Sequence, residues 1–328
     1  MSNIDLKSRP RRLRKNEIIR NLVQETFLTP SQFIAPIFIH EGREAEIKIN
    51  SMPGIYQFSI DRALKRIEEL IENKIKSIIL FGIPNNKDSQ ASSAWDEKGI
   101  VQQANKKIKE NFPDILLIND TCLCEYMDHG HCGIVMEKNI FNDPTLEILQ
   151  RTALSQASSG ADIIAPSGMM DGMVASIRSV LDENGFQDVA IMSYAVKYAS
   201  AFYGTFREAA ESTPQFGDRK SYQMNPRNKR EAIREALIDE KEGADIIMVK
   251  PALPYLDIIS SVKEKANLPI AAYSVSGEYA MIKAASQNGW LDEEKVILET
   301  LTSIKRAGAD IIISYFAKDL NNLLRHFC

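Results

Sequence analysis

Two lysines in the sequence follow directly on runs of apolar residues. Lys250 comes after the run at 246–249 and before Pro251, and Lys197 comes after the run at 189–196. A lysine at a strand end often extends its ammonium group into solvent, and this simpler interpretation is open for both. If both lysines instead lie at the mouth of one site, their like charges and partial desolvation lower the pKa of each ammonium. The neutral amine then forms Schiff bases with carbonyl groups, so two such lysines predict an enzyme that handles two carbonyl compounds together.

Three cysteines gather in the segment DTCLCEYMDHGHCG. Cys122, Cys124 and Cys132 provide three thiolates that can hold Zn²⁺ and leave its fourth position open, as a catalytic zinc requires. His129 and His131 are alternative ligands, and either one would close the site. A purely structural zinc site and three reduced core thiols are the competing interpretations.

Arginines and aromatic residues share a long segment at 198–226, which we call the lid. Arg207 and Arg219 lie among several of these aromatic residues and suit recognition of a carboxylate through bidentate hydrogen bonds. Ser276 and Tyr315 end two other apolar runs and can bind a second carboxylate through their hydroxyl groups. The sequence therefore predicts two carboxylate sites beside the two lysines.

Asp120 ends a further apolar run, ILLIND, directly before the cysteine segment. Its carboxylate can steer an amine or move a proton.

A repeated pattern indicates the elements that must position these residues. SSGADIIAPSG (158–168), EGADIIMVKP (242–251) and RAGADIIISYFA (306–317) each place Gly-Ala-Asp before a run rich in isoleucine. Glycine commonly ends a helix, and short apolar runs are typical of parallel strands that helices cover on both faces. Five further runs complete a set of eight predicted strands, at 35–39, 77–82, 115–120, 189–196 and 269–277.

Segments with helical periodicity separate most of these strands, at 59–74, 145–160, 227–243, 255–267 and 292–308. Eight alternating strands and helices predict a (β/α)₈ TIM barrel, formed by residues 31–328. A doubly wound sheet is the alternative, but no GxGxxG motif follows the first strand.

Loop lengths locate the site within the predicted barrel. The helix-to-strand connections are minimal, whereas the strand-to-helix connections at 83–97, 121–142 and 198–226 are long. Long loops in a compact domain are usually functional, and barrel enzymes place their active sites at the carboxyl ends of the strands. Lys250 lies at such an end, which weakens the interpretation that it only reaches solvent.

Composition limits the class of protein. Of the 328 residues, 44% are hydrophobic and 26% are charged, with a net charge of −4, so we expect neither a globally basic nucleic-acid binder nor a disordered acidic chain. No apolar run reaches the roughly 18 residues that cross a membrane, and we see no apolar stretch typical of a signal peptide. Four cysteines in so long a chain do not form a disulfide framework. We therefore expect a reduced, cytoplasmic protein that binds no membrane.

A basic run, RPRRLRK, lies near the N-terminus. Transit peptides are poor in acidic residues, whereas Asp5 and Glu17 flank this run. We expect residues 1–30 to form an extended N-terminal arm that packs on another surface. A basic arm that binds nucleic acid is the alternative, and strongly salt-dependent binding to a duplex would support it.

Segments spread over essentially the whole chain resemble the porphobilinogen synthase (5-aminolevulinate dehydratase) family. The resembling segments are RPRRLR, DTCLCEYMDHGHCG, APSGMMDG, SYAVKYASAFYGTFREAA, FGDRKSYQMNP, GADIIMVKPALPYLDI, AYSVSGEYAMIKAA and IKRAGADIIISYFA. The resemblance implies a (β/α)₈ barrel whose arm embraces a neighbouring subunit, in a homo-octamer. It also implies a hydro-lyase that condenses two molecules of 5-aminolevulinate into porphobilinogen, with loss of two waters, in tetrapyrrole (haem) biosynthesis.

The resemblance assigns roles to individual residues. Lys250 forms the Schiff base with the first substrate molecule and Lys197 forms it with the second. The remaining substrate-binding residues are Ser276 and Tyr315 for the first carboxylate, Arg207 and Arg219 for the second, and Tyr273 and Phe206 as walls of the site.

Metal sites also follow from the resemblance. Cys122, Cys124 and Cys132 match a zinc-dependent branch of the family, in which other members carry aspartates. Glu235, in REAIRE, matches a Mg²⁺ site outside the active site that promotes assembly, although by itself it reads as an exposed helix carboxylate. Thr205 stands where we expect proline, and the loss of a fixed φ is expected to loosen the lid slightly.

Two other functions stay open on the residues alone. A class I Schiff-base aldolase needs one Schiff-base lysine and no zinc, so it tolerates replacement of Lys197. A non-catalytic metal-binding protein uses the cysteine segment and has no need of Lys250, Arg207 or Tyr315 near the metal.

Overall fold

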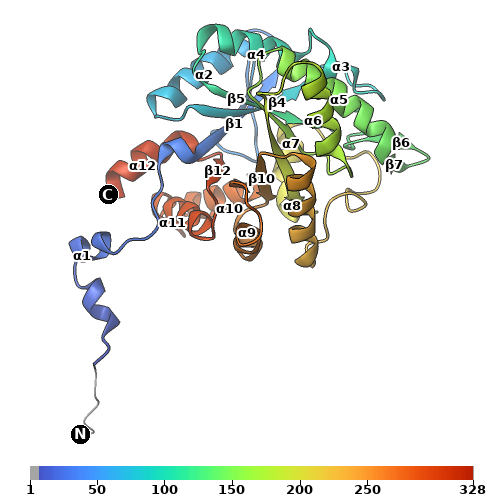
Figure 1. Cartoon of the computed structure of the whole chain (residues 1–328). Coiled ribbons are helices and arrows are strands. Elements are labelled where there is room, and N and C mark those ends of the chain that lie inside the picture. The colour runs from blue at the N-terminus through green and yellow to red at the C-terminus, as the bar shows by residue number, and fades with distance from the viewer. Residues whose placement is uncertain (1–6, 328) are drawn as a thin grey trace.

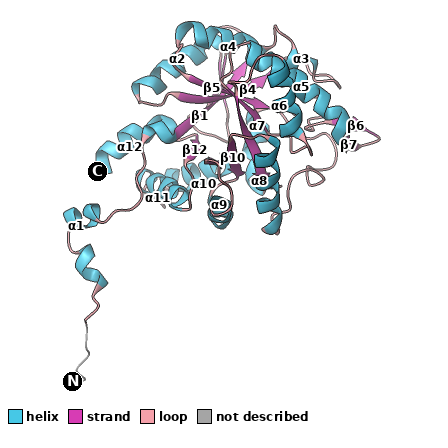
Figure 2. Ribbon diagram, in the orientation of Figure 1, coloured by secondary structure: helices cyan, strands magenta, loops and turns pink. Residues whose placement is uncertain are grey.

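Eight parallel strands form a closed barrel at the centre of the computed structural model, which describes residues 7–327 (Figures 1 and 2). The barrel strands are β1 (Phe33–His40), β4 (Ser77–Ile83), β5 (Leu116–Thr121), β8 (Ile163–Pro166), β9 (Ala190–Lys197), β10 (Ile246–Lys250), β11 (Ile270–Ser274) and β12 (Ile311–Ser314). Each strand pairs with the next in this order, and β12 pairs with β1 to close the ring. The predicted (β/α)₈ barrel and all eight predicted strands are confirmed.

Helices surround the barrel and cover its strands (Figure 2). The outer helices are α2 (Ile60–Glu72), α4 (Ile100–Asn111), α5 (Asn142–Ser158), α6 (Met173–Glu183), α8 (Arg230–Glu242), α9 (Leu256–Lys263), α10 (Ser276–Gln287), α11 (Glu293–Arg306) and α12 (Leu320–Phe327). Because helices cover one side and side chains fill the other, most barrel-strand residues are buried, as the apolar runs predicted. In the described part of the chain, no helix combines the length and apolar character that crossing a membrane requires.

Several short elements lie outside the predicted pattern. They are the strands β2 (Glu46–Lys48), β3 (Tyr56–Phe58), β6 (Ile134–Met136) and β7 (Asn139–Phe141), the helices α3 (Ser92–Trp95) and α7 (Gly204–Ala209), and the 3₁₀ turns η3 (Ala201–Tyr203), η4 (Leu253–Tyr255) and η5 (Ala317–Asp319). Most of these elements belong to loops at the carboxyl ends of the barrel strands. They build the rim around the predicted site.

The Gly-Ala-Asp repeat fastens the opposite, amino-terminal edge of the barrel. Its glycines have positive φ, for example +102° at Gly243, where helix α8 ends and the chain turns into β10. Each aspartate then pairs with the start of the preceding strand. The carboxylates of Asp162, Asp245 and Asp310 accept hydrogen bonds from the backbone N–H groups of Leu117, Ile191 and Ile270, at 2.7, 2.7 and 2.8 Å.

The first part of the segment before β1, up to α1, extends away from the barrel (Figure 1), whereas Leu28 packs against the core. The segment contains η1 (Pro10–Arg14), α1 (Glu17–Leu22) and η2 (Pro30–Gln32), and none of residues 7–32 is buried. Its apolar side chains include Ile18 and Leu22, which are 80% and 81% exposed. Residues 1–6 of the predicted arm and residue 328 of the predicted barrel lie outside the described residues.

Replacing Asp245 by alanine is expected to lower the free energy of unfolding by about 1–3 kcal/mol, because the backbone N–H of the buried Ile191 loses its acceptor. Asp245→Asn keeps an acceptor oxygen at the same place and serves as the matched control. Thermal unfolding of both variants measures the difference. Equal stability of the alanine variant and the unmodified protein would contradict this role for the repeat.

Candidate active site

Lys250 and Lys197 lie side by side at the carboxyl end of the barrel. They end β10 and β9, and the two residues are register partners in the parallel pairing of these strands. Both are buried, with exposed fractions of 4% and 5%. The strand pairing thus brings the two predicted Schiff-base lysines together and removes both from solvent.

A β-bulge in β9 places an aromatic ring beneath both amines. Between Ser193 and Val196, β9 has one residue more than the facing part of β10. The ring of Tyr194, within this bulge, lies 5.0 Å from Nζ of Lys250 and 5.5 Å from Nζ of Lys197. Strict alternation along the strand would put residues three apart on opposite faces. The bulge is therefore what lets Tyr194 contact both lysines.

Aromatic rings enclose the amine of Lys250. Its Nζ lies 4.4 Å from the ring centre of Tyr273, 4.9 Å from that of Phe206 and 5.5 Å from that of Tyr203. Tyr273 and Phe206, the predicted walls, come from β11 and from the lid helix α7. This apolar enclosure removes water from the amine.

The two lysine amines differ in their pKa values. Burial, followed by the like charge of Lys197, lowers the pKa of Lys250 from 10.5 to about 7. For Lys197, burial also opposes the charge, but the nearby cysteine sulfurs and Asp120 outweigh it and raise the pKa above 10.5. The predicted lowering of the pKa thus holds for Lys250 and is wrong for Lys197, because the cysteine sulfurs and Asp120 outweigh burial only at Lys197.

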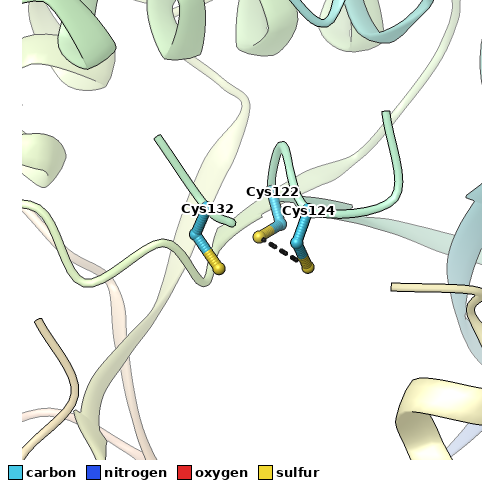
Figure 3. A group of neighbouring side chains, drawn as sticks. All are labelled: Cys122, Cys124 and Cys132. Atoms are coloured by element: carbon cyan, nitrogen blue, oxygen red, sulfur yellow. Dashed lines mark hydrogen bonds between the residues drawn. The ribbon is translucent and has the colours of Figure 1, made fainter. Parts of the chain in front are cut away.

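The three cysteines of the predicted metal site converge in the loop after β5. Figure 3 shows the sulfurs of Cys122, Cys124 and Cys132 gathered in one place, and all three residues are buried. The Sγ atoms lie within 4.8 Å of one another, and those of Cys122 and Cys124 are 3.4 Å apart. Two thiolates on one tetrahedral zinc ion are about 3.8 Å apart. Three reduced sulfurs at this spacing therefore fit a metal ion.

The alternative histidine ligands are directed elsewhere. His131 contacts the backbone oxygen of Phe216 through Nε2 at 2.9 Å and the hydroxyl of Tyr222 through Nδ1 at 3.1 Å. His129 accepts the backbone N–H of His131 through its Nδ1. Among the described residues, the second group with metal-binding spacing is Asp120, Cys122 and Glu125.

Asp120 lies between the lysines and the cysteines. It belongs to β5, and its Oδ2 accepts a hydrogen bond from the hydroxyl of Ser167 at 3.2 Å. The backbone oxygen of Ser167 in turn accepts a hydrogen bond from Nζ of Lys197 at 2.6 Å. Burial, followed by the charge of Glu125, raises the pKa of Asp120 to about 7. The Oδ1 atom of Asp120 has no protein partner and faces a buried environment.

The two predicted arginines come from the lid. Arg219 is buried, and its Nη2 donates hydrogen bonds to the backbone oxygens of Gly130 and Ser212, at 2.9 and 2.7 Å. Arg207 lies on α7 and is partly exposed. The Nε atoms of both arginines are buried without a partner, so each retains a donor for an anionic ligand.

Backbone contacts join the lid to the cysteine loop. Besides the bond from Arg219 to Gly130, the backbone N–H of Gln215 donates to the oxygen of His129 at 3.0 Å. Gly130 has a positive φ of +70°, and a Cβ atom there would lie 2.5 Å from the backbone oxygen of Thr213. Only glycine allows this approach, so the lid and the cysteine loop pack directly on each other.

Of the predicted binders of the first carboxylate, Tyr315 lies beside Tyr273, whose ring faces the amine of Lys250. The hydroxyl groups of Tyr315 and Tyr273 are 3.1 Å apart. Ser276 was predicted to end a strand, but β11 ends at Ser274 and Ser276 is the first residue of α10. Its buried hydroxyl has no partner, and a helix N-terminus favours a negative charge.

The cavity beside the two lysines is nearly closed. Its lining includes Lys197, Lys250, Asp120, Cys124, Phe206, Arg207 and Arg219. Its volume is ≈ 10 Å³, about the room of one water molecule. A substrate can enter only when the lid moves.

Two further predicted positions, Glu235 and Thr205, do not line the cavity beside the lysines. Glu235 lies on α8 in a surface pocket with Asp171 and Glu231, and burial followed by the charge of Asp171 raises its pKa. The structure shows it half-buried, not exposed. Thr205 is the second residue of α7 in the lid, where proline would also be tolerated.

Sequence reasoning gave no role to four residues of the site: Tyr194, Tyr203, Ser167 and Glu125. Ser167 directly follows β8 in APSGMMDG, so its place at a strand end could have been noticed. Tyr203 lies in the aromatic part of the lid, which was recognised only as a group. Tyr194 carried no signal, because the bulge that turns it toward the lysines is not visible in the residue pattern.

Comparisons with known proteins agree with this geometry. A family model described as delta-aminolevulinic acid dehydratase matches residues 7–323. The delta-aminolevulinic acid dehydratase of Synechococcus elongatus is 59% identical over 315 residues, covering 95% of this chain and 97% of the relative. That of Halalkalibacterium halodurans is 58% identical over 312 residues, covering 95% of each.

A solved structure shares the whole fold. It is delta-aminolevulinic acid dehydratase (porphobilinogen synthase) from Toxoplasma gondii in complex with the reaction product porphobilinogen, with a TM-score of 0.95 and 45% identity. The match covers 97% of this chain and 92% of that one. The extent of these matches, together with a barrel that brings two buried lysines beside three thiols, leads to one conclusion. The chain belongs to the delta-aminolevulinic acid dehydratase (porphobilinogen synthase) family.

Proposed function

We propose that this enzyme condenses two molecules of 5-aminolevulinate into porphobilinogen, with loss of two waters, through Schiff bases on Lys250 and Lys197. The observation that carries the proposal is the pair of buried amines in register at neighbouring strand ends. Family membership supports the reaction, and the relative from Toxoplasma gondii holds porphobilinogen. Porphobilinogen is a pyrrole, so the reaction belongs to tetrapyrrole (haem) biosynthesis.

The first substrate molecule binds at Lys250. The amine is partly neutral near pH 7, attacks the ketone carbon and forms the Schiff base as water leaves. The hydroxyl groups of Ser276 and Tyr315 donate hydrogen bonds to the carboxylate of this molecule. Tyr273 and Phe206 exclude water from the new bond and orient it.

The second substrate molecule binds at Lys197 under the lid. Arg207 and Arg219 hold its carboxylate with the donors that have no protein partner. Lys197 must lose a proton before its amine attacks the second ketone. Asp120 has a free carboxylate oxygen in the same cavity, so we assign it to proton transfer here.

Cys122, Cys124 and Cys132 are the residues that would hold a zinc ion beside the second substrate. Three sulfur ligands suit zinc and leave one position for a substrate oxygen. When bound, zinc supplies Lewis-acid polarisation of that oxygen. Reduced thiols at this site also support a reducing compartment, and we propose the cytoplasm.

Assembly and a second metal complete the proposal. The exposed apolar residues of the arm, among them Ile18 and Leu22, would be covered by the barrel of a second copy, in a homo-octamer. Glu235 lies among other carboxylates, which together attract a divalent cation. We assign Mg²⁺ to this place, away from the lysines, where it would support assembly.

Pyrrole formation from 5-aminolevulinate, with and without a zinc chelator, tests the reaction and the cysteine site together. We expect activity to disappear on chelation and to return with added Zn²⁺. Metal content, measured on the same samples, confirms that the chelator has acted. Full activity in protein that has lost its zinc would remove zinc from the mechanism while leaving the synthase reaction in place.

The rate of Schiff-base formation at Lys250 is expected to fall about tenfold per pH unit below pH 7 and to level off above it. Burial lowers the pKa of this amine from 10.5 to about 7, and only the neutral amine attacks a ketone. Reduction with borohydride in the presence of 4-oxopentanoate, followed by peptide mapping, measures the adduct. A rate that keeps rising up to pH 10 would indicate an ordinary, solvated lysine.

Lys197→Met is expected to abolish pyrrole formation and to shift the pH profile of the Lys250 adduct to higher pH. The like charge of Lys197 contributes to the lowered pKa of Lys250, and methionine removes that charge. Lys295→Met, at an exposed lysine on α11, is the control. Retained activity in Lys197→Met would point to a reaction with a single Schiff base, as in an aldolase.

A further inference from the structure

A buried glutamate connects the backbone after Lys250 to the start of α10. Glu278 lies in the first turn of α10 and is 0% exposed. Its Oε1 accepts hydrogen bonds from the backbone N–H groups of Ala252 and Leu253, at 3.1 and 2.9 Å. These two residues follow Lys250 at the second and third positions along the chain.

The other carboxylate oxygen fixes the segment that carries Ser276. Oε2 of Glu278 accepts the backbone N–H of Val275 at 3.0 Å. Val275 and Ser276 are the cap and the first residue of α10. One side chain therefore fixes both the exit of β10 and the beginning of α10.

Three backbone N–H groups donate to this carboxylate. The contacts from Ala252, Leu253 and Val275 are N–H groups, so an acceptor with two oxygens satisfies all of them. A glutamine would turn its NH₂ group toward one of these N–H groups. One of the two segments would then lose its contact and move.

The two fixed segments carry the groups that act on one substrate molecule. In the proposed function, the amine of Lys250 attacks the ketone of the first 5-aminolevulinate, and the hydroxyl of Ser276 binds its carboxylate. We propose that Glu278 is a positioning residue that sets the separation between these two groups. That separation selects substrates in which two methylene groups lie between ketone and carboxylate. The inference rests on the proposed function and adds to it the origin of chain-length selectivity.

Glu278→Gln tests the inference through the adduct at Lys250. Reduction with borohydride is carried out with 4-oxopentanoate, which has two methylenes between ketone and carboxylate, and with 5-oxohexanoate, which has three. We expect the variant to react about a hundredfold more slowly with 4-oxopentanoate, since a displacement near 1 Å has this effect on positioned groups. Its preference for 4-oxopentanoate over 5-oxohexanoate should fall in parallel.

Two controls separate positioning from general loss of structure. The adduct at Lys197, mapped in the same sample, should form at its usual rate, because Glu278 contacts neither Lys197 nor the lid arginines in the bonds described. Asp245→Asn changes a carboxylate at the opposite end of the same strand, β10, and should keep both rates. Should Glu278→Gln not fold, Glu278→Asp retains the charge but is one methylene too short to reach both segments.

The outcomes separate a failure of the role proposed for Glu278 from a failure of the proposed function on which it rests. An unchanged rate and an unchanged preference at Lys250 would overturn the role of Glu278. An equal loss at Lys197 and Lys250 would overturn it as well, because it would mark a general structural effect. If the unmodified enzyme forms no adduct at Lys250, the proposed function itself fails.

Discussion

The removal of water from two neighbouring lysine amines is the constraint on which the rest of the structure depends. Pairing of β9 with β10 places Lys197 and Lys250 in register, and aromatic rings then enclose the amine of Lys250. Desolvation disfavours charge on both amines, but the cysteine sulfurs and Asp120 outweigh it only at Lys197. The site therefore holds two chemically identical side chains in different states. Such a difference suits a reaction in which two copies of one substrate play different parts.

The amino-terminal edge of the barrel holds the strands together, and the carboxyl edge carries the residues of the candidate site. At the amino-terminal edge, the three aspartates of the Gly-Ala-Asp repeat fasten β8, β10 and β12 to the strand before each, and the connections are short. At the carboxyl edge, long loops carry the cysteines and the arginines, and their backbones contact each other through Gly130. Because these aspartate contacts lie at the amino-terminal edge, the loops at the carboxyl edge can move without loss of the strand register. The positions of the lysines thus stay fixed while the lid opens and closes.

Much of the fold and the site could be predicted because the signals are local. Apolar runs marked all eight strands, and the lysines, cysteines and arginines stood at strand ends or in long loops. The features that could not be predicted from the sequence depend on contacts between segments that are distant along the chain. Tyr194 reaches the lysines through a bulge, Ser276 begins a helix, and the raised pKa of Lys197 arises from groups on β5 and its loop. The role proposed for Glu278 likewise needs the proximity of the segment after β10 and the first turn of α10, which lie 25 residues apart in sequence.

The packing of the lid on the cysteine loop has a consequence for the metal. The sulfurs are buried, and Arg219 and Gln215 of the lid bond to the backbone of the same loop. An ion held there can exchange with solvent only through the opening that also admits the substrate. Residence time of the ion is thus coupled to occupancy of the site: an enzyme saturated with a tightly bound ligand retains its metal kinetically.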